Sequence, residues 1–247
     1  MLGFRAKLPV TDEDRLWVDQ GFARLEAMLG RERMLGARVV LPIAEDFPDR
    51  YDKSKAAAER IFCRICEHMQ VAREAIDFEV FPEENEGLRE LLPAWSQSGG
   101  KSPAGLYFHP GYDGQKCVIA VRSKQLRDPL ALVATIAHEL GHFILLGNEL
   151  IDGDSPDHEP MTDLLTVYLG FGVFTANSAA RFTQFQDDRQ QGWSMQTLGY
   201  LPEQVFGYAL ARFALERSES KPEWESYLST NVKSYFKRSK DWLAKQR

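Results

Sequence analysis

The alternation of apolar and polar residues along the chain predicts a mixture of helices and strands. Several segments carry apolar side chains three and four positions apart, which is the spacing of one helix face. Short apolar runs bounded by turn residues have the pattern of strands instead. The expected helices cover about residues 12–29, 54–71, 129–146, 160–176, 202–217 and 222–245, and the expected strands about residues 39–41, 77–81, 105–108 and 117–121.

Local signals support two helix starts and one hairpin. Thr11 offers a capping hydroxyl, and the acidic residues that follow it suit the positive end of a helix. Asp128 precedes Pro129, and proline is favoured at the first position of a helix. Residues 110–114 hold Pro, Gly and Asp between two strand-like runs, so a hairpin is expected over residues 105–121.

These elements predict an α+β fold in two parts. Strands and helices mix over residues 1–147, whereas residues 148–247 are mainly helical. The boundary is expected in the polar loop that follows Gly147. The run at about residues 117–121 is expected to form the sheet edge to which an extended peptide could add.

Composition narrows the classes of protein that fit. The net charge is -6, with 30 basic and 36 acidic residues, which argues against a nucleic-acid-binding surface. Three cysteines give no disulfide framework and suit a reducing compartment. No apolar run reaches the roughly 20 residues that a membrane span needs, and the N-terminal residues have no signal-peptide pattern. A cytoplasmic protein without a membrane or nucleic-acid partner is therefore expected.

Residues 138–142 carry the clearest chemistry of the chain. They read His-Glu-Leu-Gly-His, an H-E-x-x-H motif in the middle of the predicted helix at 129–146. Side chains four positions apart share a helix face, so His138 and His142 can bind one metal ion. Zinc suits neutral imidazole ligands and lowers the pKa of bound water to about 7, and Glu139 is placed to accept the proton. An exposed helix face carrying these residues by chance is the alternative, but polar groups in so apolar a helix are costly to bury without a role.

A catalytic zinc site needs a third protein ligand. Glu159 and Asp163 lie four positions apart at the start of the helix predicted after residue 158. Sixteen residues separate His142 from Glu159, which is enough for the first helix to end and for a loop to turn back. His158 is a second candidate for the ligand position.

H-E-L-G-H followed by E-x-x-x-D on a second helix resembles the gluzincin group of metallopeptidases, the thermolysin-like zincins. The resemblance covers about residues 118–176. It implies a zincin-like fold, a Zn²⁺ cofactor, Glu159 as the third ligand and Asp163 as the carboxylate that orients His138. It also implies a peptide or protein substrate.

Two features depart from the gluzincin pattern. Pro160 follows the expected ligand directly, and a residue before proline is pushed away from helical geometry, so Glu159 is expected in a loose first turn. Gluzincins also use a later histidine to stabilise the oxyanion, whereas this chain has no histidine after His158. A hydroxyl or guanidinium group would have to replace it. The candidates are Tyr168, Tyr200, Tyr208 and Arg212.

The sequence therefore predicts a zinc metallopeptidase and leaves two alternatives open. The same metal chemistry would serve a hydrolase of non-peptide amides. A zincin-derived binding or regulatory protein with little turnover is the second alternative, which the missing histidine favours and the intact Glu139 disfavours. The C-x-x-C pair Cys63 and Cys66 is expected to be buried in a helix, and His109 is expected at the surface.

Overall fold

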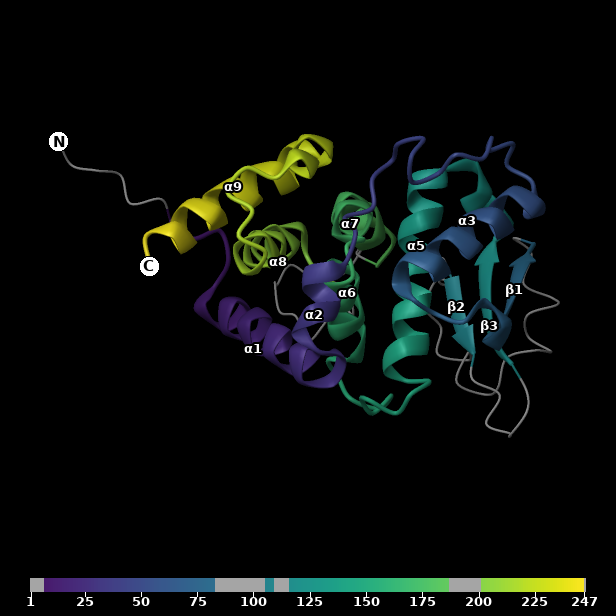
Figure 1. Cartoon of the computed structure of the whole chain (residues 1–247), viewed down its shortest axis with the longest axis horizontal. Helices are drawn as coiled ribbons and strands as arrows, with labels where there is room; N and C mark the ends of the chain where they lie inside the picture. Colours follow the sequence, from purple (N-terminus) through teal and green to yellow (C-terminus); the bar gives the residue numbers. More distant parts are fainter. Residues whose placement is uncertain (1–6, 83–104, 109–115, 187–200, 247) are drawn as a thin grey trace. The chain divides into compact units, whose positions relative to one another are not determined.

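The computed structural model describes residues 7–82, 105–108, 116–186 and 201–246, and for residues 180–186 it describes the backbone alone (Figure 1). The expected α+β class is confirmed, because a small mixed sheet lies in the first half and the second half is helical. None of the helices in these ranges is long and apolar enough to cross a membrane.

The chain folds into two compact units, Pro42–Glu149 and Met1–Leu41 with Leu150–Arg247. The unit of residues 42–149 ends two residues after Gly147, where the sequence analysis places a boundary. The first 41 residues, however, belong to the helical unit and not to the unit with the sheet. The sequence pattern could not reveal this because only long-range packing joins the two ends of the chain.

The unit of residues 42–149 is built on three strands, β1 (Ile76–Phe81), β2 (Gly105–Phe108) and β3 (Cys117–Arg122). β3 lies in the middle, parallel to β1 and antiparallel to β2. Helices α3 (Lys55–Met69) and α5 (Pro129–Leu145) pack against each other, and α5 also contacts β2 and β3 (Figure 1). Alternate residues of β3 are buried, as expected for a strand with one face in the core.

The expectation that residues 117–121 form a free sheet edge is wrong. Ile119 of β3 is paired with Phe78 of β1 on one side and with Tyr107 of β2 on the other. Within the described ranges the sheet edges are β1 and β2. The backbone of β3 is therefore already paired and cannot accept an added peptide strand.

α5 begins as its sequence predicts. The Asp128 carboxylate accepts a hydrogen bond of 3.1 Å from the backbone N–H of Ala131, and Pro129 occupies the first turn. Every residue from Ala131 to His142 is buried. The helix is thus enclosed on all sides over most of its length, and its polar residues lie inside the protein.

The helical unit surrounds a core built from both ends of the chain. α1 starts with the expected capping box, in which Thr11 and Asp14 exchange hydrogen bonds between side chain and backbone. α1 packs on α6 and α8, and α8 packs extensively on α9. The helices of this unit are α1 (Asp12–Leu29), α2 (Arg31–Gly36), α6 (His158–Tyr168), α7 (Gly172–Gln186), α8 (Glu203–Glu216) and α9 (Thr230–Ala244), with the 3-10 helix η5 at Glu223–Tyr227.

One arginine ties the N-terminal segment to the end of α8. Nη1 of Arg217 donates hydrogen bonds of 2.8–2.9 Å to the carbonyl oxygens of Met34, Leu35 and Ala37. These carbonyls lie at the C-terminal end of α2, where backbone C=O groups run out of helical partners, although that of Met34 also accepts a hydrogen bond of 3.3 Å from the N–H of Ala37. The guanidinium group therefore stabilises the end of α2 and fixes it to α8.

The single helix predicted at residues 160–176 is in fact two helices. α6 ends at Tyr168, α7 begins at Gly172, and Gly170 between them has a φ of 88°. A side chain at Gly170 would collide with the carbonyl oxygen of Arg38. The tertiary contact therefore requires the break, although the apolar pattern continues through it. α7 also extends to Gln186, beyond the end at residue 176 that the sequence predicts.

The strand predicted at residues 39–41 is also absent, and this segment has irregular backbone. Val40 is fully buried, and its N–H donates a 3.0 Å hydrogen bond to the carbonyl oxygen of Gly170. A contact with the α6–α7 break thus replaces sheet pairing. The apolar character that suggested a strand comes from core packing.

Gly170→Ala should destabilise the protein, because the new methyl group requires an unfavourable positive φ and overlaps the Arg38 backbone. We expect a loss of about 1–3 kcal/mol, or roughly 2–10 °C in the thermal midpoint. Gly36→Ala is the matched control, because a methyl group there meets open space. Equal midpoints for the two variants, measured by circular dichroism, would contradict the account of the break.

Candidate metal centre

α5 places two imidazole groups one helical turn apart. His138 and His142 are each 6 % exposed, and their ring centroids lie 4.7 Å apart with the ring planes at 87°. Residues four positions apart on a helix project from the same face, which explains the proximity. The pair therefore gives two nitrogen ligands on a buried helix.

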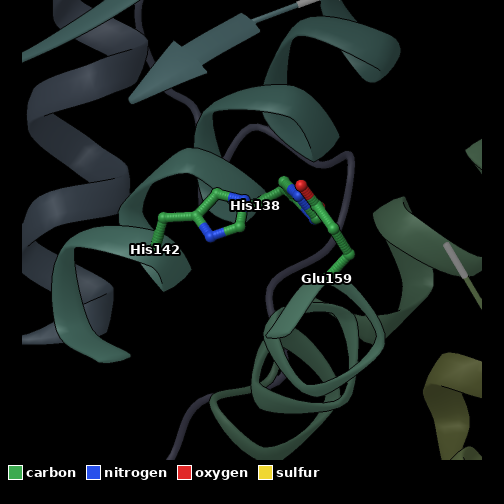
Figure 2. A group of neighbouring side chains, drawn as sticks. All are labelled: His138, His142 and Glu159. Carbon is green, nitrogen blue, oxygen red and sulfur yellow. The ribbon is translucent and has the colours of Figure 1, made fainter. Parts of the chain in front are cut away.

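The carboxylate of Glu159, the second residue of α6, completes a group of possible ligands (Figure 2). One ligand atom from each of His138, His142 and Glu159 lies within 4.8 Å of the others. Two imidazoles and one carboxylate are also a donor set that suits zinc.

The group brings together the three residues that the sequence proposed as ligands, and it does not include His158. Nδ1 of His158 lies 2.8 Å from the carbonyl oxygen of Ser155, which can only accept, so Nδ1 carries the hydrogen. Nε2 of His158 lies 3.3 Å from Oε1 of Glu159. With the hydrogen on Nδ1, Nε2 can donate to the Glu159 carboxylate only when the His158 ring is protonated.

Glu139 is a buried carboxylate of this region, with 6 % of its surface exposed. It follows His138 directly on α5 and lies outside the group of three ligands. Its side chain packs against Gly105 of β2, within the unit of residues 42–149. The residue thus lies on the helix of the two histidines and outside the group that could hold a metal ion.

Asp163 lies on α6 one turn after Glu159 and is 4 % exposed. Its Oδ2 accepts a hydrogen bond of 2.9 Å from the backbone N–H of Leu201, just before α8. This contact fixes the carboxylate between two distant parts of the chain and was not predicted from the sequence. The expected role of Asp163 in orienting His138 stays a prediction.

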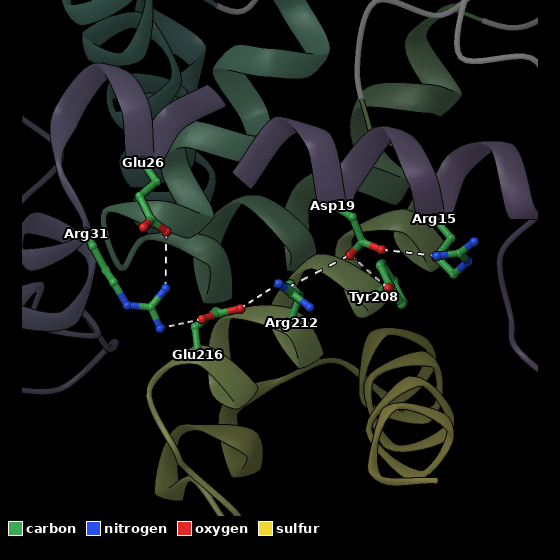
Figure 3. Close-up of polar contacts among 7 residues, drawn as sticks. All are labelled: Arg15, Asp19, Glu26, Arg31, Tyr208, Arg212 and Glu216. Carbon is green, nitrogen blue, oxygen red and sulfur yellow. Dashed lines mark hydrogen bonds and ion pairs between the residues drawn. The ribbon is translucent and has the colours of Figure 1, made fainter. Parts of the chain in front are cut away.

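Three of the expected oxyanion donors make structural contacts inside the helical unit. The Tyr168 hydroxyl donates to the carbonyl oxygen of Gly30 at 3.0 Å. The Tyr208 hydroxyl donates to Asp19 at 3.0 Å, and Arg212 pairs with Glu216 (Figure 3). Burial raises the pKa of Tyr168 to about 12 and also raises the pKa of Tyr208. The fourth candidate, Tyr200, lies outside the described residues, as does His109.

Tyr107 of β2 contacts the histidine helix and was not singled out from the sequence. Its ring stacks on His142 with a centroid distance of 6.3 Å and an interplanar angle of 22°. Its hydroxyl lies 3.7 Å from Sγ of Cys117, and burial, with this hydrogen bond, raises the pKa of Tyr107 well above its usual range. The alternation of side chains along residues 105–108 was the signal that could have placed it against α5.

The other residues considered from sequence do not form a second centre among the described residues. Burial raises the pKa of the Cys66 thiol to about 12, so the group is a neutral, unreactive thiol near neutral pH. Asp157 accepts hydrogen bonds from Arg24 and Ser155 and so belongs to the start of α6.

Comparison of the chain with models of protein families, with curated proteins and with solved structures found no match. What the structure adds to the resemblance of the motif is the group of His138, His142 and Glu159, which could hold a metal ion.

The purified protein should carry about one zinc ion per chain, because the group offers three ligands to a single ion. His138→Ala and His142→Ala should each remove the metal, since two remaining ligands bind it weakly. His68→Ala, on α3 and outside the group, is the control. Elemental analysis after zinc-supplemented purification measures the content. A protein free of divalent metal would exclude the site.

The third ligand can be identified by comparing three variants of α6. Glu159→Ala should weaken zinc binding severely, because it removes a ligand. Asp163→Asn should weaken it by roughly 10- to 100-fold, the usual effect of losing a carboxylate that orients a ligand. His158→Ala should have the smallest effect, at most about tenfold. Competition with a chelator of known affinity gives the constants, and metal loss in His158→Ala with retention in Glu159→Ala would reverse the assignment.

Proposed function

We propose that the chain is a zinc-dependent hydrolase of the zincin type that cleaves peptide bonds. The observation that carries the proposal is the group of His138, His142 and Glu159, with ligand atoms within 4.8 Å of one another. A buried carboxylate outside this group, Glu139, lies on the same helix as the two histidines. Two imidazoles, one carboxylate ligand and one nearby carboxylate are the set that hydrolysis by activated water requires.

Zinc, when bound by this group, would supply a Lewis acid that lowers the pKa of coordinated water to about 7. Glu139 would accept the proton as the water oxygen bonds to the carbonyl carbon. It would then return the proton to the leaving nitrogen as the carbon–nitrogen bond breaks. The products would be a carboxylic acid and an amine.

The ligands and their neighbours would have different tasks. His138, His142 and Glu159 would hold the ion. Asp163 would fix the orientation of His138, as carboxylates beside metal-bound histidines commonly do. α5 is buried around His138 and His142, and the exclusion of water strengthens electrostatic interactions at these residues.

A peptide or protein substrate is favoured by the resemblance of H-E-L-G-H and E-x-x-x-D to gluzincins. A hydrolase of other amides would use the same residues, so substrate profiling has to separate the two. A binding protein with little turnover is the second candidate. It is favoured by the structural contacts of Tyr168, Tyr208 and Arg212, which occupy three of the side chains considered as oxyanion donors.

Glu139→Gln should keep zinc and lose most of its turnover, because the amide preserves the shape of the side chain but cannot accept the proton. General base catalysis contributes about 100- to 10,000-fold. The measurement is the cleavage of a peptide library and a small-amide library, followed by mass spectrometry in isotopically labelled water. Incorporation of water oxygen into a peptide product identifies a peptidase.

The control for this experiment is the zinc content of the variant. Loss of zinc from folded Glu139→Gln would assign Glu139 to the ligands. A zinc-loaded parent protein that cleaves neither library would instead support the binding protein.

A further inference from the structure

Two residues of β2 lie against the second and the last residue of the H-E-x-x-H motif, Glu139 and His142. Gly105 and Tyr107 are two positions apart, so they face the same side of the strand. Gly105 adjoins Glu139 of α5, and the Tyr107 ring stacks on His142. β2 therefore supports both the base and a ligand from within the unit of residues 42–149.

We propose that Gly105 is a positioning residue for Glu139, and this inference depends on the proposed role of Glu139 as general base. A Cβ atom at Gly105 would lie 2.7 Å from Oε1 and 3.0 Å from Cγ of Glu139. Both distances are shorter than ordinary van der Waals contacts. The side chain of Glu139 thus lies directly on the strand backbone, in space that any other residue at 105 would occupy.

Space is the property that requires glycine here. The φ of Gly105 is not in the left-handed region, where Gly30 and Gly170 lie, so an alanine could adopt its backbone conformation. The methyl of Thr135 is the third close neighbour, 2.6 Å from the same Cβ position. Gly105 is therefore enclosed by two side chains of α5, and only its small size permits their present positions.

β2 is held in place by pairing with the central strand and by the contacts of Tyr107 with α5. Gly105 is paired with Val121 of the central strand, and Tyr107 with Ile119. The Tyr107 ring also contacts Phe143 at 6.4 Å between centroids. The carboxylate end of Glu139 is the more flexible partner, so an alanine at 105 would displace the carboxylate while leaving the strand in place.

Such a displacement would affect catalysis as well as folding. A general base has to lie about 2.6–3.2 Å from the atom whose proton it accepts. A misplacement of about 1 Å can cost roughly 100-fold in rate. Zinc binding should be unaffected, because Glu139 is not in the ligand group.

The contact is tested first without metal or substrate, by thermal unfolding in a chelator. All variants carry Thr135→Ser, which removes the close methyl but keeps the hydroxyl that accepts a hydrogen bond from Gln125. In this background Gly105→Ala should lower the midpoint by about 2–10 °C. Adding Glu139→Ala should abolish most of that loss, because the overlapping side chain is gone. An equal loss with and without Glu139 would overturn the proposal.

The positioning role is then tested on the zinc-loaded protein with labelled casein as the substrate. Gly105→Ala should retain one zinc and lose about tenfold to 100-fold in kcat with little change in KM. Gly36→Ala should match the parent in both constants. An unchanged kcat in zinc-loaded Gly105→Ala would overturn the role. A parent protein without zinc and without turnover would contradict the proposed function instead, while the coupling in unfolding would still report the contact.

Discussion

The burial of polar groups on α5 is the constraint that shapes this molecule. His138, Glu139 and His142 lie inside the protein on a helix that is otherwise apolar. Buried imidazoles and carboxylates are costly unless polar partners or a metal compensate them. His138, His142 and Glu159 form a group that could hold a metal ion, which would compensate the two imidazoles. The proposed chemistry and the stability of the helix therefore depend on the same few contacts.

Much of the fold was predictable because its signals are local. The caps at Thr11 and Asp128 and the spacing of His138 and His142 are read within one or two helical turns. The same holds for Glu159 and Asp163, which share one face of α6. Local hydrogen bonds and side-chain spacing can be recognised directly in the sequence.

The failures all concern contacts between distant residues. The break at Gly170 is imposed by Arg38, and the central position of β3 by pairing on both sides. The hydrogen bond from Leu201 to Asp163 joins residues 38 positions apart. Gly105 gave no signal, because a glycine at the start of a strand has the same pattern whether it borders solvent or a buried carboxylate. Packing of this kind depends on tertiary structure and produces no periodic pattern in the sequence.

The division of the helical unit between both ends of the sequence has a consequence during protein synthesis. α1 leaves the ribosome before the unit of residues 42–149, whereas its packing partners α6 and α8 follow that unit. Residues 42–149 have all their own strands and helices available first and can fold as a unit. The apolar face of α1 therefore stays exposed while more than a hundred further residues are synthesised. A nascent chain stalled in this interval would expose that face to chaperones.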